Sequence, residues 1–172
     1  MTTYLDWDTD GADWPNRDAS RFVDAAQMRW HVQVMGKGPV ALLLHGTGSS
    51  THSWRDVMPI LANHFTVVAP DLPGHGFTSK PTQQSLSLPG MAGAIGALLK
   101  KLDMKPERAA GHSAGSAVMV RMAVERFMTP DLLAAADSLV GQGCGALRIV
   151  PVFLGQGGHL REDLPRRVEA VR

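Results

Sequence analysis

The chain has 172 residues, of which 44% are hydrophobic and 19% charged, and its formal net charge is +1. This length suggests one domain that can bury a core, and the balanced charge argues against nucleic acid or an anionic membrane as partner. The single cysteine, Cys144, excludes an intrachain disulfide. No apolar run is long enough to span a bilayer, and the acidic start lacks a signal-peptide pattern, so we expect a cytoplasmic protein.

The first 20 residues are predicted to form an arm that precedes the folded core. They carry five aspartates and little apolar periodicity. Trp7 and Trp14 either pin this arm to the body of the protein, or the arm is a loose tail.

A β-hairpin is predicted next, over residues 21–24 and 28–35. In its second strand Trp30, Val32 and Val34 alternate with polar residues, which predicts one buried face. The histidine between them, His31, is therefore expected at the surface.

Residues 40–44 form a continuous apolar run, which is typical of a central parallel strand covered on both faces. The run leads into His45-Gly46-Thr47-Gly48. A strand that enters such a glycine loop can supply half of an oxyanion hole, with the backbone N–H of Thr47 as donor. The alternative is a plain glycine-rich loop. Neither G-x-G-x-x-G nor G-K-[ST] is present, so a dinucleotide or phosphate loop is excluded.

Further elements follow in alternation. The helix predicted over residues 53–63 should bury one apolar side made by Trp54, Val57, Met58 and Leu61. The other predicted elements are a buried strand over 65–70, a helix over 89–102, a short strand over 106–110, a helix over 114–128 and another to about 139. This order predicts an α/β fold with a doubly wound, mostly parallel sheet.

The pattern G-x-S-x-G occurs at Gly111-His112-Ser113-Ala114-Gly115, between the last strand and its helix. It predicts a nucleophile elbow, in which Ser113 lies on a strained turn and the N–H of Ala114 faces the same space. The alternative is a turn of small residues. This turn, the His45 loop and the segment D-L-P-G-H-G at 71–76 should all lie at the carboxyl ends of strands, where α/β sheets bind ligands.

These motifs resemble the α/β-hydrolase family over residues 14–128. They include L-L-L-H-G-T-G-S-S at 42–50, F-T-V-V-A-P-D-L-P-G-H-G-F-T at 65–78 and G-H-S-A-G at 111–115. With W-P-N-R-D-A-S-R-F-V at 14–23, the chain most resembles the magnesium-chelatase accessory hydrolase-fold proteins of bacteriochlorophyll biosynthesis. The resemblance implies a role near magnesium insertion into protoporphyrin, with magnesium chelatase as a partner.

Members of that family usually continue with late strands, a helical cap and an acid–histidine pair, whereas here residues 129–172 remain. We therefore expect an arm (1–20), an incomplete α/β-hydrolase core (21–128) and a shortened or divergent C-terminal segment (129–172). A frameshifted or artificial segment is the rival account. The run 147–154 can form a strand, and the loop that follows, at 155–165, resembles the family's catalytic-histidine loop.

The resulting catalytic assignment is Ser113 as nucleophile, His159 as base and, more weakly, Asp137 as acid. His159 is the only histidine after Ser113 in the chain, and Asp137 lies 24 residues after that serine. The alternatives are an exposed loop histidine and a helix-surface charge. With Thr47 and Ala114 holding the oxyanion, this set performs acyl transfer. No cluster has metal-ligand spacing, so neither a metal nor a cofactor is predicted.

Three functions are compatible with these features. The first is a serine hydrolase acting on a small ester, such as a tetrapyrrole ester. The second is a non-catalytic accessory protein that binds a tetrapyrrole or contacts the chelatase, and the third is an inactive fragment. Serine at position 113 argues against the aspartate-nucleophile dehalogenases and epoxide hydrolases of the same fold.

Overall fold

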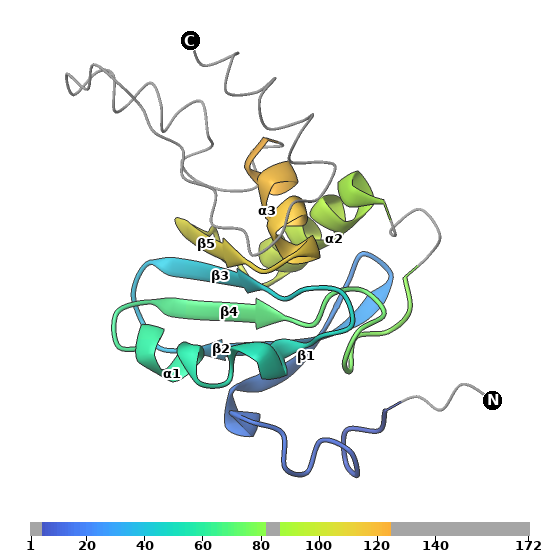
Figure 1. Cartoon of the computed structure of the whole chain (residues 1–172), viewed down its shortest axis with the longest axis vertical. Helices are drawn as coiled ribbons and strands as arrows, with labels where there is room; N and C mark the ends of the chain where they lie inside the picture. Colours follow the sequence, from blue (N-terminus) through green and yellow to red (C-terminus); the bar gives the residue numbers. More distant parts are fainter. Residues whose placement is uncertain (1–4, 82–86, 125–172) are drawn as a thin grey trace.

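The computed structural model describes residues 5–81 and 87–124, which form a five-stranded mixed sheet with helices on both faces (Figure 1). The strands are β1 (Ser20–Ala25), β2 (Met28–Met35), β3 (Val40–Leu44), β4 (Thr66–Pro70) and β5 (Arg108–Gly111). The helices are α1 (Val57–Leu61), α2 (Leu88–Lys101) and α3 (Ala114–Val124), with 3-10 turns η1 (Arg17–Ala19) and η2 (Thr51–Trp54). Among these residues no helix is long and apolar enough to cross a membrane.

The strand order in the sheet is β1-β2-β4-β3-β5, with antiparallel pairing on the β1 side and parallel pairing on the β5 side. β1 pairs with β2 and β2 with β4 in antiparallel fashion, whereas β3 lies parallel to both β4 and β5. The predicted hairpin is therefore confirmed as β1 and β2. The three parallel strands end at the same edge of the sheet, which is where the sequence predicts the site.

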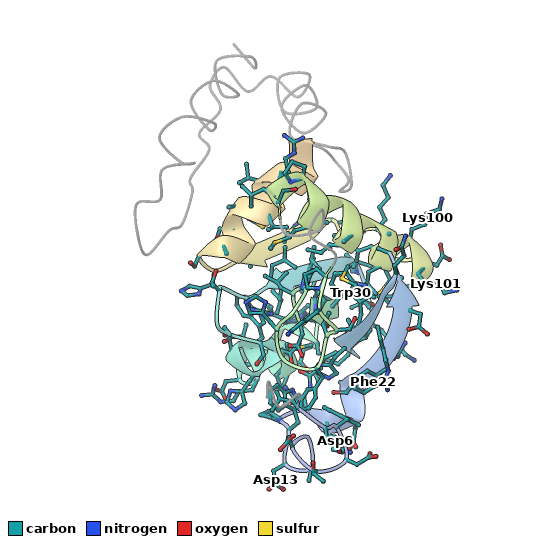
Figure 2. The ribbon with its side chains drawn as sticks, turned by 90° about the vertical axis from the view of Figure 1, so that its right-hand side faces the viewer. Asp6, Asp13, Phe22, Trp30, Lys100 and Lys101 are labelled. Carbon is teal, nitrogen blue, oxygen red and sulfur yellow. The ribbon has the colours of Figure 1, made fainter. Side chains whose placement is uncertain are left out.

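The two faces of β3 bury alternate side chains, as the continuous apolar run predicts. Leu42 and Leu44 belong to the core cluster that also holds residues of α2 and α3, while Leu43 packs with Met58 of α1 on the opposite face. Figure 2 shows Trp30 in the interior, and this side chain is completely buried in the α2–α3 cluster. Successive residues of a strand point to opposite sides of the sheet, so β3 contributes side chains to the cores on both faces.

One predicted helix, over residues 53–63, is in fact two short pieces, η2 and α1. Pro59 explains the break, because a helix that began at Ser53 would place this proline in its interior, where its missing N–H costs a hydrogen bond. When the helix begins at Val57, Pro59 lies in the first turn. The prediction that Val57 faces the core is wrong, since its side chain is 40% exposed, whereas Met58 is fully buried.

Two of the three polar residues of β2 are also buried, and only Arg29 is exposed, which corrects the prediction of one buried face. His31 is 0% and Gln33 is 1% exposed, because the N-terminal arm lies across them. The Nε1–H of Trp14 donates to Thr51 Oγ1 (3.1 Å), and the Trp7 ring centroid is 4.9 Å from that of His31. The described part of the arm is thus pinned to the body rather than loose, and His31 is not a surface residue.

Candidate active site

Three loops meet at the carboxyl ends of the parallel strands. They are residues 45–50 after β3, 71–78 after β4 and 112–113 after β5. A Cβ placed on Gly46 would lie 2.9 Å from His112 Nδ1 and 3.1 Å from Ser113 Cβ. The loop after β3 and the turn after β5 are therefore in direct contact, and a side chain at position 46 would force them apart.

Ser113 lies between the end of β5 and the start of α3, with a left-handed φ of +53°. Its side chain is exposed. A non-glycine residue pays a steric penalty in this region, so the turn must be held by its surroundings. Gly115 lets the start of α3 pack directly against the end of β3, because any Cβ there would collide with the carbonyl oxygens of Leu44 and His45. The Ser116 hydroxyl also closes the turn by donating to the Gly111 carbonyl (2.5 Å).

Thr47 and Ala114, the expected oxyanion donors, flank the same region. Thr47 is exposed, and Ala114 is the first residue of α3. Neither N–H donates to another described residue. The turn that carries Thr47 is closed by a hydrogen bond from the Ser49 N–H to the Gly46 carbonyl (3.2 Å). Both N–H groups thus have no partner within residues 5–81 and 87–124, while their role as an oxyanion hole stays a prediction.

His45 fixes the start of this loop from inside. Its Nε2 accepts from the Leu72 N–H (2.8 Å), and its Nδ1–H donates to the Gly46 carbonyl (2.8 Å). One nitrogen accepts and the other donates, so the ring is neutral. Burial of the imidazole lowers its pKa, which keeps the ring neutral as the pH falls.

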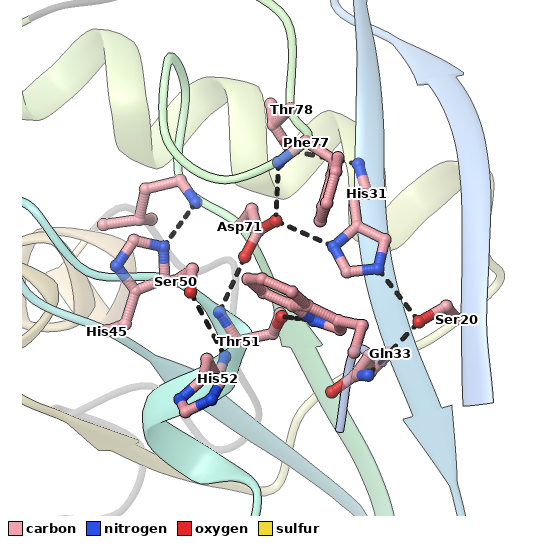
Figure 3. A network of polar contacts seen from close by, with 12 residues as sticks. Ser20, His31, Gln33, His45, Ser50, Thr51, His52, Asp71, Phe77 and Thr78 are labelled. Carbon is pink, nitrogen blue, oxygen red and sulfur yellow. Dashed lines mark hydrogen bonds and ion pairs between the residues drawn. The ribbon is translucent and has the colours of Figure 1, made fainter. Parts of the chain in front are cut away.

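A buried polar network, not predicted from the sequence, lies beside these loops (Figure 3). At its centre Asp71 Oδ2 is 2.7 Å from His31 Nδ1, and both side chains are 0% exposed. The same carboxylate accepts from the Thr51 N–H (2.6 Å) and the Phe77 N–H (3.0 Å). Burial favours the neutral acid, but the hydrogen bond and charge of His31 and the two N–H groups outweigh it and hold the Asp71 pKa below its usual value.

The network continues from His31 Nε2 to Ser20 Oγ (2.9 Å), so it contains a serine, a histidine and an aspartate in hydrogen-bonded order. The imidazole is enclosed by aromatic rings at centroid distances of 4.9–6.3 Å. These rings belong to Trp7, Trp14, Phe22 and Phe77. Because no solvent reaches His31, a substrate cannot reach it either, and this chain of bonds is structural.

Residues 39–142 match the family described as alpha/beta hydrolase fold, which covers more than half of the chain. The chain belongs to the α/β-hydrolase fold family. It is 38% identical over 116 residues to the magnesium-chelatase 30 kDa subunit of Rhodobacter capsulatus, which is 66% of this chain and 41% of that protein. It is 37% identical over 109 residues to a fluoroacetate dehalogenase from Burkholderia sp., covering 61% of this chain and 36% of that protein.

Solved α/β-hydrolases agree with this placement. The crystal structure of an epoxide hydrolase from Vigna radiata superposes with a TM-score of 0.58 and 32% sequence identity. The match covers 62% of this chain and 36% of that one. This α/β-hydrolase chain thus spans about two fifths or less of the length of these relatives.

The described part of this α/β-hydrolase brings together Ser113 and the loop of Thr47, but two predicted site residues lie outside it. His159 and Asp137 both fall after residue 124. Within the described residues no group of three or more His, Cys, Asp or Glu could hold a metal ion. Asp71 is the residue that the sequence-based prediction missed, although its position directly after a buried strand and the polar His31 within an apolar strand were both visible signals.

Proposed function

We propose that this chain is a serine hydrolase that acts on an ester or related acyl substrate, with Ser113 as its nucleophile. The carrying observation is the position of Ser113. Its side chain is exposed on a left-handed turn at the start of α3, in contact with the loop after β3. A strained turn persists only where the structure enforces it, and such turns are frequent at active sites.

In the proposed reaction Ser113 Oγ attacks the acyl carbon while a base takes its proton. The N–H groups of Thr47 and Ala114 then donate to the developing oxyanion, and the positive end of the α3 dipole adds to this field. The tetrahedral intermediate collapses to an acyl-enzyme as the base gives the proton to the leaving alkoxide. Water then hydrolyses the ester bond between the acyl group and Ser113. We assign the base to His159 and, as a weaker assignment, its orienting acid to Asp137.

The chemistry of residue 113 favours acyl transfer over the reactions named for two relatives, a fluoroacetate dehalogenase and an epoxide hydrolase. A serine hydroxyl needs a base to become nucleophilic, and it forms an ester intermediate with an acyl group. An aspartate would instead attack as a carboxylate, and no aspartate occupies this turn.

The match to the magnesium-chelatase subunit supports a second candidate, an accessory role in magnesium chelation and bacteriochlorophyll biosynthesis. In that case the ligand is a tetrapyrrole or its ester, and the chain either hydrolyses it or holds it without catalysis. The second candidate predicts saturable quenching of tryptophan fluorescence by protoporphyrin that survives Ser113→Ala.

The deciding experiment for the first candidate is a rapid-mixing assay with p-nitrophenyl acetate. We expect a burst of p-nitrophenolate approaching one equivalent of protein, followed by slow turnover, because formation of an acyl-enzyme releases the alcohol first. Ser113→Ala should abolish the burst, whereas Ser87→Ala, at the exposed N-cap of α2, should retain it. Equal release by wild type and Ser113→Ala would overturn the proposal.

A further inference from the structure

We propose that Asp71 is a positioning residue for the oxyanion donor, because it fixes the far end of the loop that carries Thr47. The inference rests on the proposed function, in which the Thr47 N–H stabilises the oxyanion. Asp71 does not touch the reacting atoms in this account. It acts through the backbone of residues 45–51, here called the donor loop.

The donor loop is held at both ends by two consecutive residues that follow β4. At its start, His45 Nε2 accepts from the Leu72 N–H (2.8 Å). At its end, the Thr51 N–H donates to Asp71 Oδ1 (2.6 Å). Of the residues between these bonds, Thr47 and Gly48 are exposed. Between the two anchors the turn is closed by the bond from the Ser49 N–H to the Gly46 carbonyl (3.2 Å), so a shift of either anchor would move the Thr47 N–H with the turn.

The carboxylate of Asp71 is itself held from three directions. Besides Thr51 it accepts from His31 Nδ1 (2.7 Å) on β2 and from the Phe77 N–H (3.0 Å) on the following loop. Gly76 packs so closely that any Cβ there would collide with the carboxylate. Hydrogen bonds to a buried charge are short and strong. Asp71 thus joins β2, the donor loop and the loop after β4 at one point.

Replacing Asp71 by asparagine tests the charge with almost no change in shape. The amide oxygen can still accept one N–H, but the amide nitrogen is a donor and cannot accept from the Phe77 N–H or the Thr51 N–H. One of these two backbone groups loses its partner in a buried place, so the donor loop or the loop after β4 must shift. Misplacement of an oxyanion donor by about 1 Å costs up to about 100-fold in rate.

The experiment measures covalent labelling of Ser113 by an alkyl fluorophosphonate at a series of probe concentrations. We expect Asp71→Asn to lower the limiting labelling rate constant by about 10- to 100-fold, because the donor acts in the transition state. The half-saturating probe concentration should change by less than about threefold, since ground-state binding does not use the oxyanion contact. Asp24→Asn, an exposed carboxylate on β1, is the charge-matched control and should label like wild type.

A second pair of variants tests the anchor without touching Asp71. Thr51→Pro removes the N–H that Asp71 accepts, and Thr51→Val retains it, while both lose the hydroxyl that accepts from Trp14. Proline is tolerated at the first residue of a helical turn, and the preceding Ser50 is extended (φ −159°, ψ −174°), as a residue before proline must be. The limiting rate constant for labelling of Ser113 should therefore be at least about 10-fold lower in Thr51→Pro than in Thr51→Val.

Loss of fold and loss of positioning give different results. Partial unfolding lowers the fraction of protein labelled at completion, whereas misplacement lowers the rate constant at full final labelling. If Ser113 is labelled in wild type and both Asp71→Asn and Thr51→Pro keep the wild-type rate constant, the positioning role is overturned. If wild-type Ser113 is not labelled at all, the proposed function fails, and amide hydrogen exchange of the 45–51 peptide then decides on Asp71. Faster exchange than in Asp24→Asn supports the anchor, and equal exchange refutes it.

Discussion

The left-handed backbone at Ser113 makes a prediction about stability that is independent of catalysis. A Cβ at this φ of +53° causes about 1–2 kcal/mol of steric strain, and glycine, which has no Cβ, avoids this strain. Glycine also gives the unfolded chain more freedom, and this opposes the gain by about 0.4–1 kcal/mol. We therefore expect Ser113→Gly to be more stable than Ser113→Ala by about 1 kcal/mol, the reverse of their usual order.

The assay is equilibrium urea unfolding of both variants, with the free energy of unfolding compared at equal m-values. Because both variants lack the hydroxyl of the exposed Ser113, the comparison isolates the effect of the Cβ on the backbone. The same pair of substitutions at Ser53, within the 3-10 turn η2, is the control, and there alanine should be the more stable. If alanine is also the more stable residue at 113, the turn is not strained and the reasoning fails.

Other predictions follow from the packing and the buried bonds. Gly115→Ala should destabilise by about 1–3 kcal/mol because its Cβ meets the backbone oxygens of Leu44 and His45, whereas Gly93→Ala, in an open part of α2, should stabilise by up to about 1 kcal/mol. Urea unfolding that ranks the two variants otherwise would contradict this packing. Burial lowers the folded-state pKa of His45, so between that value and about 6.5 the unfolded state binds more protons, and the free energy of unfolding should fall as pH falls below about 6.5. His45→Asn should flatten this slope between pH 7.5 and 5.5, and an unchanged slope would exclude His45 as its source. Trp14→Phe should cost about 1 kcal/mol by removing the bond to Thr51, as measured by thermal unfolding, and no loss would mean that the bond contributes nothing.

The periodic parts of the fold were predictable from the sequence. Residues 40–44 and 67–70 are apolar at every position. Strands of that kind are covered on both faces, as the two core clusters around Leu42 and Leu43 confirm. The position of Ser113 between a strand and a helix was also predictable, because glycine at 111 and 115 serves close backbone approaches that few other sequences permit.

The errors arose where a distant segment changed the environment of a local pattern. Alternation along β2 predicts an exposed face, yet the arm of Trp7 and Trp14 covers it and buries His31. A local pattern cannot reveal a cover that comes from residues more than 15 positions away. The Asp71 network was missed for the same reason, since its partners come from β2, η2 and the loop after β4.

The most direct test of the central proposal is to identify which serine reacts. The folded 172-residue protein is treated with an alkyl fluorophosphonate, digested and analysed by tandem mass spectrometry, with Ser113→Ala treated in parallel. The proposed function predicts one adduct on Ser113 in the wild-type protein and none in Ser113→Ala. The proposal would be contradicted if the folded wild-type protein carried no adduct at Ser113. It would also be contradicted if the wild-type protein and Ser113→Ala were modified to the same extent.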